Sequence, residues 1–151
     1  MKNKSELLDS YNNFINTHDI VSIAVSDKDN TPWIFNAFYM VDKQGNLIFL
    51  SGNDTKHSKI IKTNSIVCAT VYDHSSTFGN VTGIQIQGTL KEISFLEGSK
   101  YLIKFKNRFD KTLNEDLKQV IGSRFYKLTP TFVKYRNSKE FNSSKEIQLS
   151  L

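Results

Sequence analysis

The feature that most constrains the fold is an alternation of apolar and polar residues in the segment Thr82–Ile93. Its apolar residues are Ile84, Ile86 and Leu90, and its polar residues are Gln85, Gln87 and Thr89. Successive side chains of a β-strand point to opposite faces, so this pattern predicts a long strand with one buried face.

Five further segments show strand composition and are separated by turn residues. They are Val21–Val25, Trp33–Val41, Leu47–Ser51, Ile66–Tyr72 and Phe125–Arg136. Turns at 27–30 and 42–46 join the first three, which predicts two consecutive hairpins in an antiparallel meander. Pro130 interrupts the last segment, and because proline has no N–H to donate, we expect a bulge or an edge position there.

Helical spacing of apolar residues predicts helices between and before these strands. The expected helices are Lys4–Thr17, started by Asn3, then Thr55–Asn64, Leu96–Phe109 and Asn114–Ile121. Six strands at short spacing with few helices predict a mainly β chain of the α+β class. We therefore expect one domain over residues 1–151, built as a small antiparallel β-barrel with flanking helices.

Charge and hydropathy narrow the function classes. The net charge of +5 favours an anionic partner, either a nucleic acid or a phosphorylated small molecule. No apolar run approaches the roughly 20 residues of a membrane-spanning helix, and the N-terminus lacks the apolar core of a signal peptide. We therefore expect no membrane contact and a cytoplasmic location.

The single cysteine excludes an internal disulfide and any multi-cysteine metal site. Cys68 lies in the apolar run Ile66–Thr70, which predicts a buried, inert thiol. His18, His57 and His74 have no carboxylate or histidine at ligand spacing, so we expect no metal site.

The segment Ser51–Ser65 is the first candidate site, because it places hydroxyls, a histidine and lysines around a helix start. A helix N-terminus suits a phosphate group, and Ser51, Thr55, Lys56 and His57 supply further donors. His57 lies on the same side of this helix as Ile60 and Ile61, which predicts that it is partly buried. The alternative is a solvated stripe formed by the lysines at positions 56, 59 and 62, which this segment alone favours.

Two strand segments are further candidates. Asn36, Ala37, Phe38 and Tyr39 place polar and small residues in a bulky strand, either near a bulge or as a flat surface for a planar ring. Gln85 and Gln87 share one strand face and serve either a ligand or a subunit interface, or they are ordinary outward polar residues. The sequence shows no catalytic triad, paired-carboxylate signature or phosphate-binding glycine loop, so any catalysis would depend on a cofactor.

Together these segments resemble one family. The order of elements is similar to that of the flavin-binding split barrels related to pyridoxamine-phosphate oxidase, with a small uncharacterised bacterial branch most alike. The shared motifs are NAFY at 36–39, TKH at 55–57, Thr70-Val71 and GIQIQG at 83–88, and the resemblance covers Leu7–Arg136.

The resemblance implies a six-stranded antiparallel split β-barrel of the FMN-binding type, working as a homodimer with FMN at the subunit interface. It implies that Asn36, Ala37, Phe38 and Tyr39 line the ring and ribityl chain. Ser51, Thr55, Lys56 and His57 would hold the phosphate, and Gln85 or Gln87 would reach the flavin of the other protomer. The implied function is an FMN-dependent oxidoreductase acting on an unidentified small molecule; the alternative is a non-catalytic flavin- or haem-binding module.

Two departures from the family pattern limit the implied activity. The family's oxidase has an Arg-Lys pair where this chain has Lys56-His57, and its Trp-, Arg- and His-rich C-terminal signature is missing from 127–136. We therefore expect no vitamin-oxidase activity. Nucleic-acid binding is also not expected, because Tyr101, Phe105 and Phe109 beside the basic residues are spaced as core residues rather than as a stacking surface.

Overall fold

A computed structural model describes residues 4–109, 122–140 and 145–147. The helices are α1 (Lys4–Thr17), α2 (Lys56–Ile61) and α3 (Phe95–Phe109). The strands are β1 (Ile20–Ser26), β2 (Pro32–Val41), β3 (Leu47–Gly52), β4 (Ile66–Tyr72), β5 (Thr82–Glu92), β6 (Ser123–Asn137) and β7 (Lys145–Ile147). The helix expected at Asn114–Ile121 lies outside the described residues. So does Asn3, which was expected to start the first helix.

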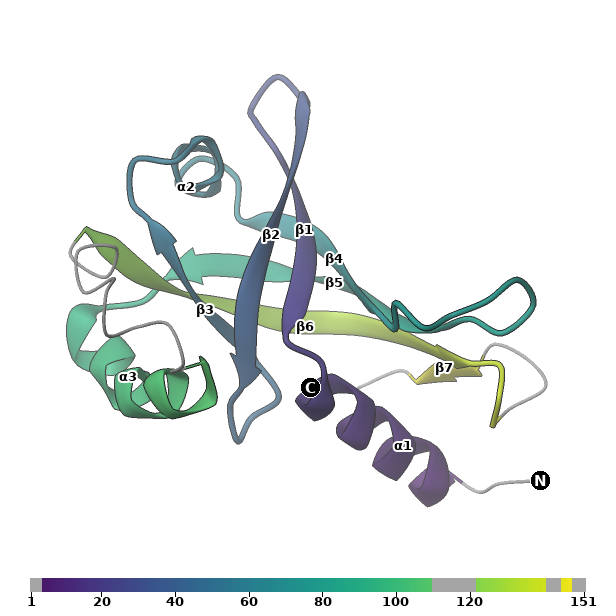
Figure 1. The fold of residues 1–151 in the computed structure, drawn as a ribbon. Helices are drawn as coiled ribbons and strands as arrows, with labels where there is room; N and C mark the ends of the chain where they lie inside the picture. Colours follow the sequence, from purple (N-terminus) through teal and green to yellow (C-terminus); the bar gives the residue numbers. More distant parts are fainter. Residues whose placement is uncertain (1–3, 110–121, 141–144, 148–151) are drawn as a thin grey trace.

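The strands form one antiparallel sheet that closes on itself (Figure 1). Its order is β3-β2-β1-β4-β5-β6-β7, and β3 also pairs with the first half of β6. This last pairing, between Leu47–Gly52 and Ser123–Leu128, turns six of the strands into a closed barrel. The expected mainly β, six-stranded antiparallel barrel with flanking helices is confirmed, and the β1-β2-β3 meander is confirmed within it.

Pro130 lies at a β-bulge inside β6. The β5–β6 register shifts between Gln87 and Gly88, so that Gly88 faces Pro130 and Thr131 has no partner in the ladder. Neither the pairing with β3 nor that with β7 includes Pro130, so its missing N–H interrupts no ladder on that side. Gly88 fits here because a Cβ at this position would lie 2.4 Å from the Thr129 carbonyl oxygen. Of the two expected positions, the structure therefore shows the bulge.

The barrel interior is filled by the inward residues of the strands, and α1 packs against one end. Inward residues include Ile23, Ile84, Leu90, Leu128 and Val133. The phenol of Tyr39 also lies here and donates a 2.7 Å hydrogen bond to the Ile15 carbonyl of α1, which ties the helix to β2. Leu7, Tyr11, Phe14 and Ile15 supply the buried side of α1, as their helical spacing predicted.

A second apolar cluster lies outside the barrel wall, under α3. Phe105 of this helix packs with Met40, Ile48, Ile93 and Phe125. Gly98 allows the close approach, since a Cβ there would lie 2.4 Å from the Phe125 ring. Helix α3 therefore covers the outer surface of β3 and of the first half of β6. Tyr101 and Phe109 pack against the same cluster, in line with the core spacing expected for them.

Some boundaries and one burial expectation differ from the sequence analysis. Helix α2 is shorter than expected and ends at Ile61, and β7 was not predicted. Cys68 is exposed rather than buried, so that prediction was wrong. The apolar run around it is a strand whose inward residues are Val67, Ala69 and Val71, which turns Cys68 outward. Among the described residues, no helix combines the length and apolar character needed to cross a membrane.

Candidate functional site

The start of α2 is built around its N-cap residue, Thr55. The Thr55 hydroxyl accepts a hydrogen bond from the Ser58 backbone N–H at 3.2 Å, as a cap does. The same oxygen bonds the Ser58 hydroxyl at 2.7 Å. Thr55 is therefore the N-cap of α2, and its hydroxyl is engaged in holding the helix start together.

His57 is wedged between the barrel and the end of β3. Its Nε2 lies 2.6 Å from the Ser51 hydroxyl, and its ring stacks on Phe35 with centroids 3.8 Å apart and planes 8° apart. Burial lowers the pKa of His57, since an imidazolium would lose hydration there. The expected partial burial of His57 is confirmed, and at neutral pH the residue offers hydrogen bonds without a charge.

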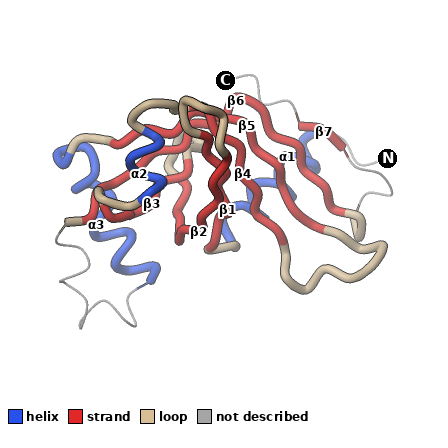
Figure 2. Tube along the Cα trace, turned by 90° about the horizontal axis from the view of Figure 1, so that it is seen from above, coloured by secondary structure: helices blue, strands red, loops and turns tan. Residues whose placement is uncertain are grey.

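Lys56 supplies the positive charge of this end of the barrel. Its ammonium lies 4.1 Å from the centre of the Trp33 ring, near the tip of the β1–β2 hairpin. Figure 2 shows α2 beside that hairpin. Among the described residues, no carboxylate pairs with Lys56, so its charge is compensated only by the weak attraction of the indole face.

The segment Asn36–Tyr39 divides between the two sides of β2. Asn36 and Phe38 are exposed on the outer side, whereas Ala37 is half-buried and packs against the core. Tyr39 has no exposed surface, and burial raises its pKa. Strand alternation places the Tyr39 side chain in the core, where its hydroxyl bonds α1.

Strand register gathers the outward polar residues in one row across the sheet. Asn36 of β2 faces Ser22 of β1, Ser22 faces Thr70 of β4, and Thr70 faces Gln85 of β5. The Ser22 hydroxyl donates to the Asn36 side-chain oxygen at 2.7 Å. Gln85 and Gln87 are both exposed and line a hollow of about 420 Å³ on this outer surface.

Large apolar side chains are exposed around this polar row. They are Ile20, Ile34, Phe38, Ile66 and Tyr72, each more than half exposed. We call the outer surface of β2, β1, β4 and β5 that carries them the open sheet face. Single exposed apolar residues are ordinary, but a group on one sheet face marks an interaction surface.

The predicted site residues thus form two groups. Ser51, Thr55, Lys56 and His57 lie around the start of α2, where Ser51 bonds His57, Thr55 bonds Ser58 and Lys56 lies over Trp33. Asn36, Phe38, Gln85 and Gln87 lie on the open sheet face. Strand β2 links the groups, since Phe35 stacks on His57 from its inner side and Asn36 faces outward next to it.

Solved structures with this architecture are found among several bacterial proteins. HutZ, the heme storage protein from Vibrio cholerae, superposes with a TM-score of 0.67 at 15% identity, covering 86% of this chain and 91% of HutZ. A putative pyridoxamine 5'-phosphate oxidase from Listeria innocua superposes with a TM-score of 0.67 at 17% identity. The match covers 87% of this chain and 99% of that protein. A protein of unknown function from Agrobacterium tumefaciens superposes with a TM-score of 0.76 at 14% identity. The match covers 97% of this chain and 60% of that longer protein.

The fold is a pyridoxamine 5'-phosphate oxidase-like split barrel. In sequence, the split barrel is 26% identical over 106 residues to a UPF0306 protein of Pasteurella multocida, covering 69% of this chain and 70% of that protein. No protein-family profile matches the chain. The residues described in this split barrel contain no group of three histidine, cysteine or carboxylate side chains placed to hold a metal ion.

Sequence reasoning missed several residues that shape the site of this split barrel. Trp33 and Phe35 form the surfaces on which Lys56 and His57 rest. Trp33 lies three residues and Phe35 one residue before Asn36, so strand alternation places both on the opposite side of the strand from Asn36. Ser22 and Thr70 join Asn36 and Gln85 through strand register, which the linear sequence does not display.

Proposed function

We propose that this split barrel binds FMN as a homodimer and acts as an FMN-dependent oxidoreductase on a small molecule. The proposal is supported by two features: a cationic, hydroxyl-rich cluster at the start of α2, and an open sheet face with exposed apolar and amide side chains. The names of the structural neighbours, an oxidase of a phosphorylated amine and a heme storage protein, fit a cofactor-binding barrel.

The cluster around α2 fits a phosphate group by its donor set. Lys56 supplies a charge without a carboxylate partner in the described structure, and His57 and Ser51 supply a neutral hydrogen-bonded pair with atoms 2.6 Å apart. A phosphate accepts strong, charge-assisted hydrogen bonds from such groups. Thr55 contributes by fixing the start of the helix, because its hydroxyl is already committed to Ser58.

The open sheet face fits the remaining requirements, a subunit interface and a planar apolar ring. Its five large apolar side chains would be covered by a second copy of the chain. Asn36 and Phe38 of one copy, with the Ala37 backbone between them, would border the ring. Gln85 and Gln87 lie on the same face, so they would reach a cofactor held by the other copy.

The chain's own contribution to a reaction would be positioning, because the described site contains no pair of acid and base side chains. Bound FMN would supply reversible transfer of electrons, which no protein side chain here provides. Lys56 and His57 would fix one end of the cofactor, and the apolar side chains at the interface would exclude water from the other. We do not propose that the substrate is pyridoxamine phosphate, since the segment 127–136 lacks the Trp-, Arg- and His-rich substrate signature of that oxidase.

The observation that carries the proposal is that Lys56, which has no carboxylate partner among the described residues, is next in the chain to the hydrogen-bonded His57–Ser51 pair at the barrel end. It is tested by titrating the purified chain with FMN and following flavin absorbance and the fluorescence of the single tryptophan, Trp33, on which Lys56 rests. We expect Lys56→Gln to weaken FMN binding roughly tenfold or more, as loss of a charge-assisted hydrogen bond does. Lys59→Gln, an exposed lysine of the same helix, is the matched control and should bind as the unchanged chain does.

Three outcomes separate the possibilities. Absence of any flavin binding, or equal loss in both lysine variants, would contradict the proposal. A haem Soret band in place of flavin bands would favour the storage module suggested by the likeness to HutZ. Flavin that binds but is never reoxidised by an acceptor after reduction with NADH or NADPH would favour a non-catalytic flavin module.

A further inference from the structure

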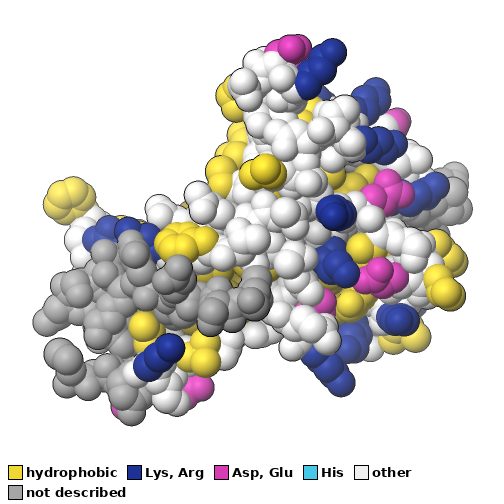
Figure 3. Space-filling model, turned by 180° about the vertical axis from the view of Figure 1, so that it is seen from behind, with side chains coloured by type: hydrophobic (Ala, Val, Ile, Leu, Met, Phe, Trp, Pro, Cys, Tyr) yellow, Lys and Arg dark blue, Asp and Glu magenta, His cyan; other side chains and the backbone are white. Residues whose placement is uncertain are grey.

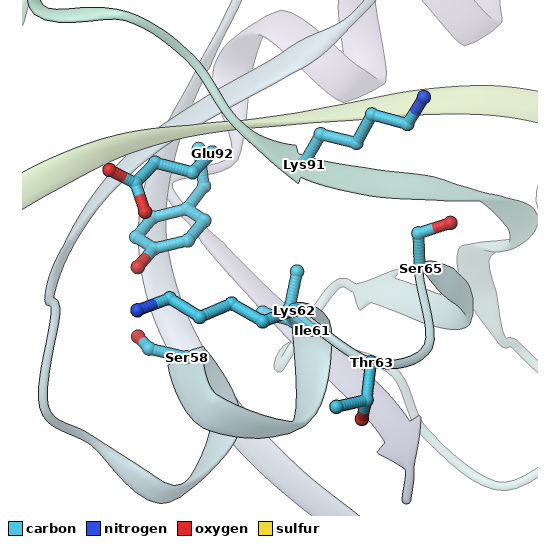
Figure 4. Close-up of a pocket in the computed structure, with 8 residues that line it drawn as sticks. Ser58, Ile61, Lys62, Thr63, Ser65, Lys91 and Glu92 are labelled. Carbon is cyan, nitrogen blue, oxygen red and sulfur yellow. The ribbon is translucent and has the colours of Figure 1, made fainter. Parts of the chain in front are cut away.

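A pocket that the proposed flavin site does not use lies behind α2, on the side away from Trp33. It encloses about 360 Å³ between the last turn of α2, the start of β4 and the paired ends of β5 and β6. Figure 4 shows the Lys62 side chain running from α2 toward the Ser58 hydroxyl, with the Glu92 carboxylate on the opposite side, while the Lys91 side chain extends along β5 away from Lys62. Lys62 is exposed, as expected for a solvated lysine, and its side chain also lines this pocket.

The Tyr126 hydroxyl is the unusual group of the pocket. Tyr126 is 1% exposed and its ring stacks on Phe49 inside the barrel, yet its hydroxyl has no hydrogen-bond partner. A buried hydroxyl without a partner is costly, so native structures rarely leave one unless a ligand or solvent uses it. Burial raises the pKa of Tyr126, so at neutral pH the group is a neutral donor.

Ser58 does not satisfy this hydroxyl. It is close enough to lower the pKa of Tyr126 against the larger effect of burial, but the two hydroxyls do not reach hydrogen-bonding geometry. The Ser58 hydroxyl donates to the Gly52 carbonyl at 2.6 Å and also bonds Thr55 at 2.7 Å. Its hydrogen is therefore committed to the Gly52 carbonyl.

The charges of the pocket favour an acceptor ligand. Lys62 and Lys91 have no carboxylate partner within the described part of the chain, whereas the Glu92 carboxylate lies 3.6 Å from the Arg124 guanidinium. The available groups are thus two ammonium donors and one phenol donor, against one carboxylate that is already compensated. Figure 3 shows the wider setting: lysine and arginine side chains gather on the half of that view that carries α2 and α3.

We propose that this pocket binds a small phosphate, held by the Tyr126 hydroxyl and the Lys62 ammonium with Lys91 at the rim. A phosphate oxygen would give the buried phenol the partner it lacks and would place negative charge next to the uncompensated ammonium. The repulsion from Glu92 is limited by Arg124. This site is separate from the Lys56 cluster, since Lys62 lies against β5 and β6 whereas Lys56 lies on Trp33 of β2.

The test measures binding of inorganic phosphate by calorimetry to the full chain carrying Lys56→Gln, so that the proposed flavin site is already weakened. Chloride holds the ionic strength constant. In this background we expect Tyr126→Phe and Lys62→Gln each to weaken phosphate binding at least tenfold, with Lys59→Gln unchanged as the matched control. Methyl phosphate, measured in parallel, shows whether the pocket takes free phosphate or a phosphate monoester; binding of either supports the proposal if the two variants lose it.

Two results would overturn the proposal: binding of neither inorganic phosphate nor methyl phosphate to the Lys56→Gln chain, or equal affinity in all variants. Tyr126→Phe keeps the ring and removes only an unsatisfied hydroxyl, so we expect it to fold at least as stably as its parent without phosphate. Lys62→Gln changes an exposed side chain and provides an independent variant. FMN titration of Tyr126→Phe and Lys62→Gln should match the unchanged chain, which separates failure of this site from failure of the proposed flavin site.

Discussion

The outer surface of the barrel has two regions of similar apolar character, of which one is buried and the other is exposed. Over β3 and the first half of β6, Met40, Ile48 and Phe125 are buried under α3. Over β2, β1, β4 and β5, the open sheet face leaves Ile34, Phe38, Ile66 and Tyr72 more than half exposed. Helix α3 covers the first region, whereas on the second it reaches only Phe38, whose ring lies 5.3 Å from that of Phe109. The second region is the surface on which we propose that a second copy of the chain binds.

The covered region should show the largest stability effect. Phe105 is the buried side chain that α3 inserts into its cluster. Phe105→Ala should lower the free energy of unfolding by about 3–5 kcal/mol, as a large buried side chain replaced by alanine does. Urea unfolding measures this change. The control is Phe38→Ala on the open sheet face, which should lower the free energy of unfolding far less at protein concentrations at which the chain is monomeric. Similar losses in both variants would remove the contrast between the two regions.

The open sheet face should show its effect in association. Ile34 is 62% exposed, so Ile34→Asp should change the stability of the isolated chain by only about 0.5 kcal/mol. In a dimer the same carboxylate would be buried unpaired, and we expect dissociation to become at least tenfold easier. Sedimentation velocity over a concentration series measures this. An unchanged chain that is monomeric at all concentrations would show that a second copy does not cover this face.

Cys68 offers a smaller, chemical readout of the same face. Its side chain is exposed between Ala24 of β1 and Gln87 of β5, its partners in strand register. A thiol reagent should therefore label it readily in Ile34→Asp and more slowly in the unchanged chain, where a second copy would shield it. Labelling rates followed by absorbance test this. Equal rates would place Cys68 outside the interface even if the chain dimerises.

The end of the barrel at α2 should show the weakest effect, and a pH-dependent one. Burial lowers the pKa of His57 in the folded chain, so the unfolded chain binds more protons as the pH falls below about 6.5. Stability should therefore decrease from that pH down to the folded pKa, and His57→Gln should flatten this part of the profile. Thermal unfolding across the pH range measures it, with His74→Gln in an exposed loop as the control. A profile that His74→Gln flattens equally would assign the effect elsewhere.

Much of the fold was readable from the sequence because strand alternation and turn residues are local signals. The alternation of Ile84, Gln85 and Ile86 fixed which side of β5 is buried, and Pro130 marked the bulge in β6. The same rule, applied to Ile66–Thr70, turns Cys68 outward. The prediction of a buried thiol was wrong because it used the apolar composition of the run and not its alternation. Clustering of Ser51, Thr55, Lys56 and His57 also followed from one short segment.

By itself, then, the sequence determined the six strands of the barrel, the three described helices and the partial burial of His57, because each depends on neighbours within a few residues. Only the tertiary structure decided that β3 pairs with β6 to close the barrel, that Lys56 rests on Trp33, and that Tyr126 meets Lys62 in a pocket. These contacts join residues far apart in the chain. They depend on which strand edges meet and which side chains then fill the space, and no local periodicity encodes that.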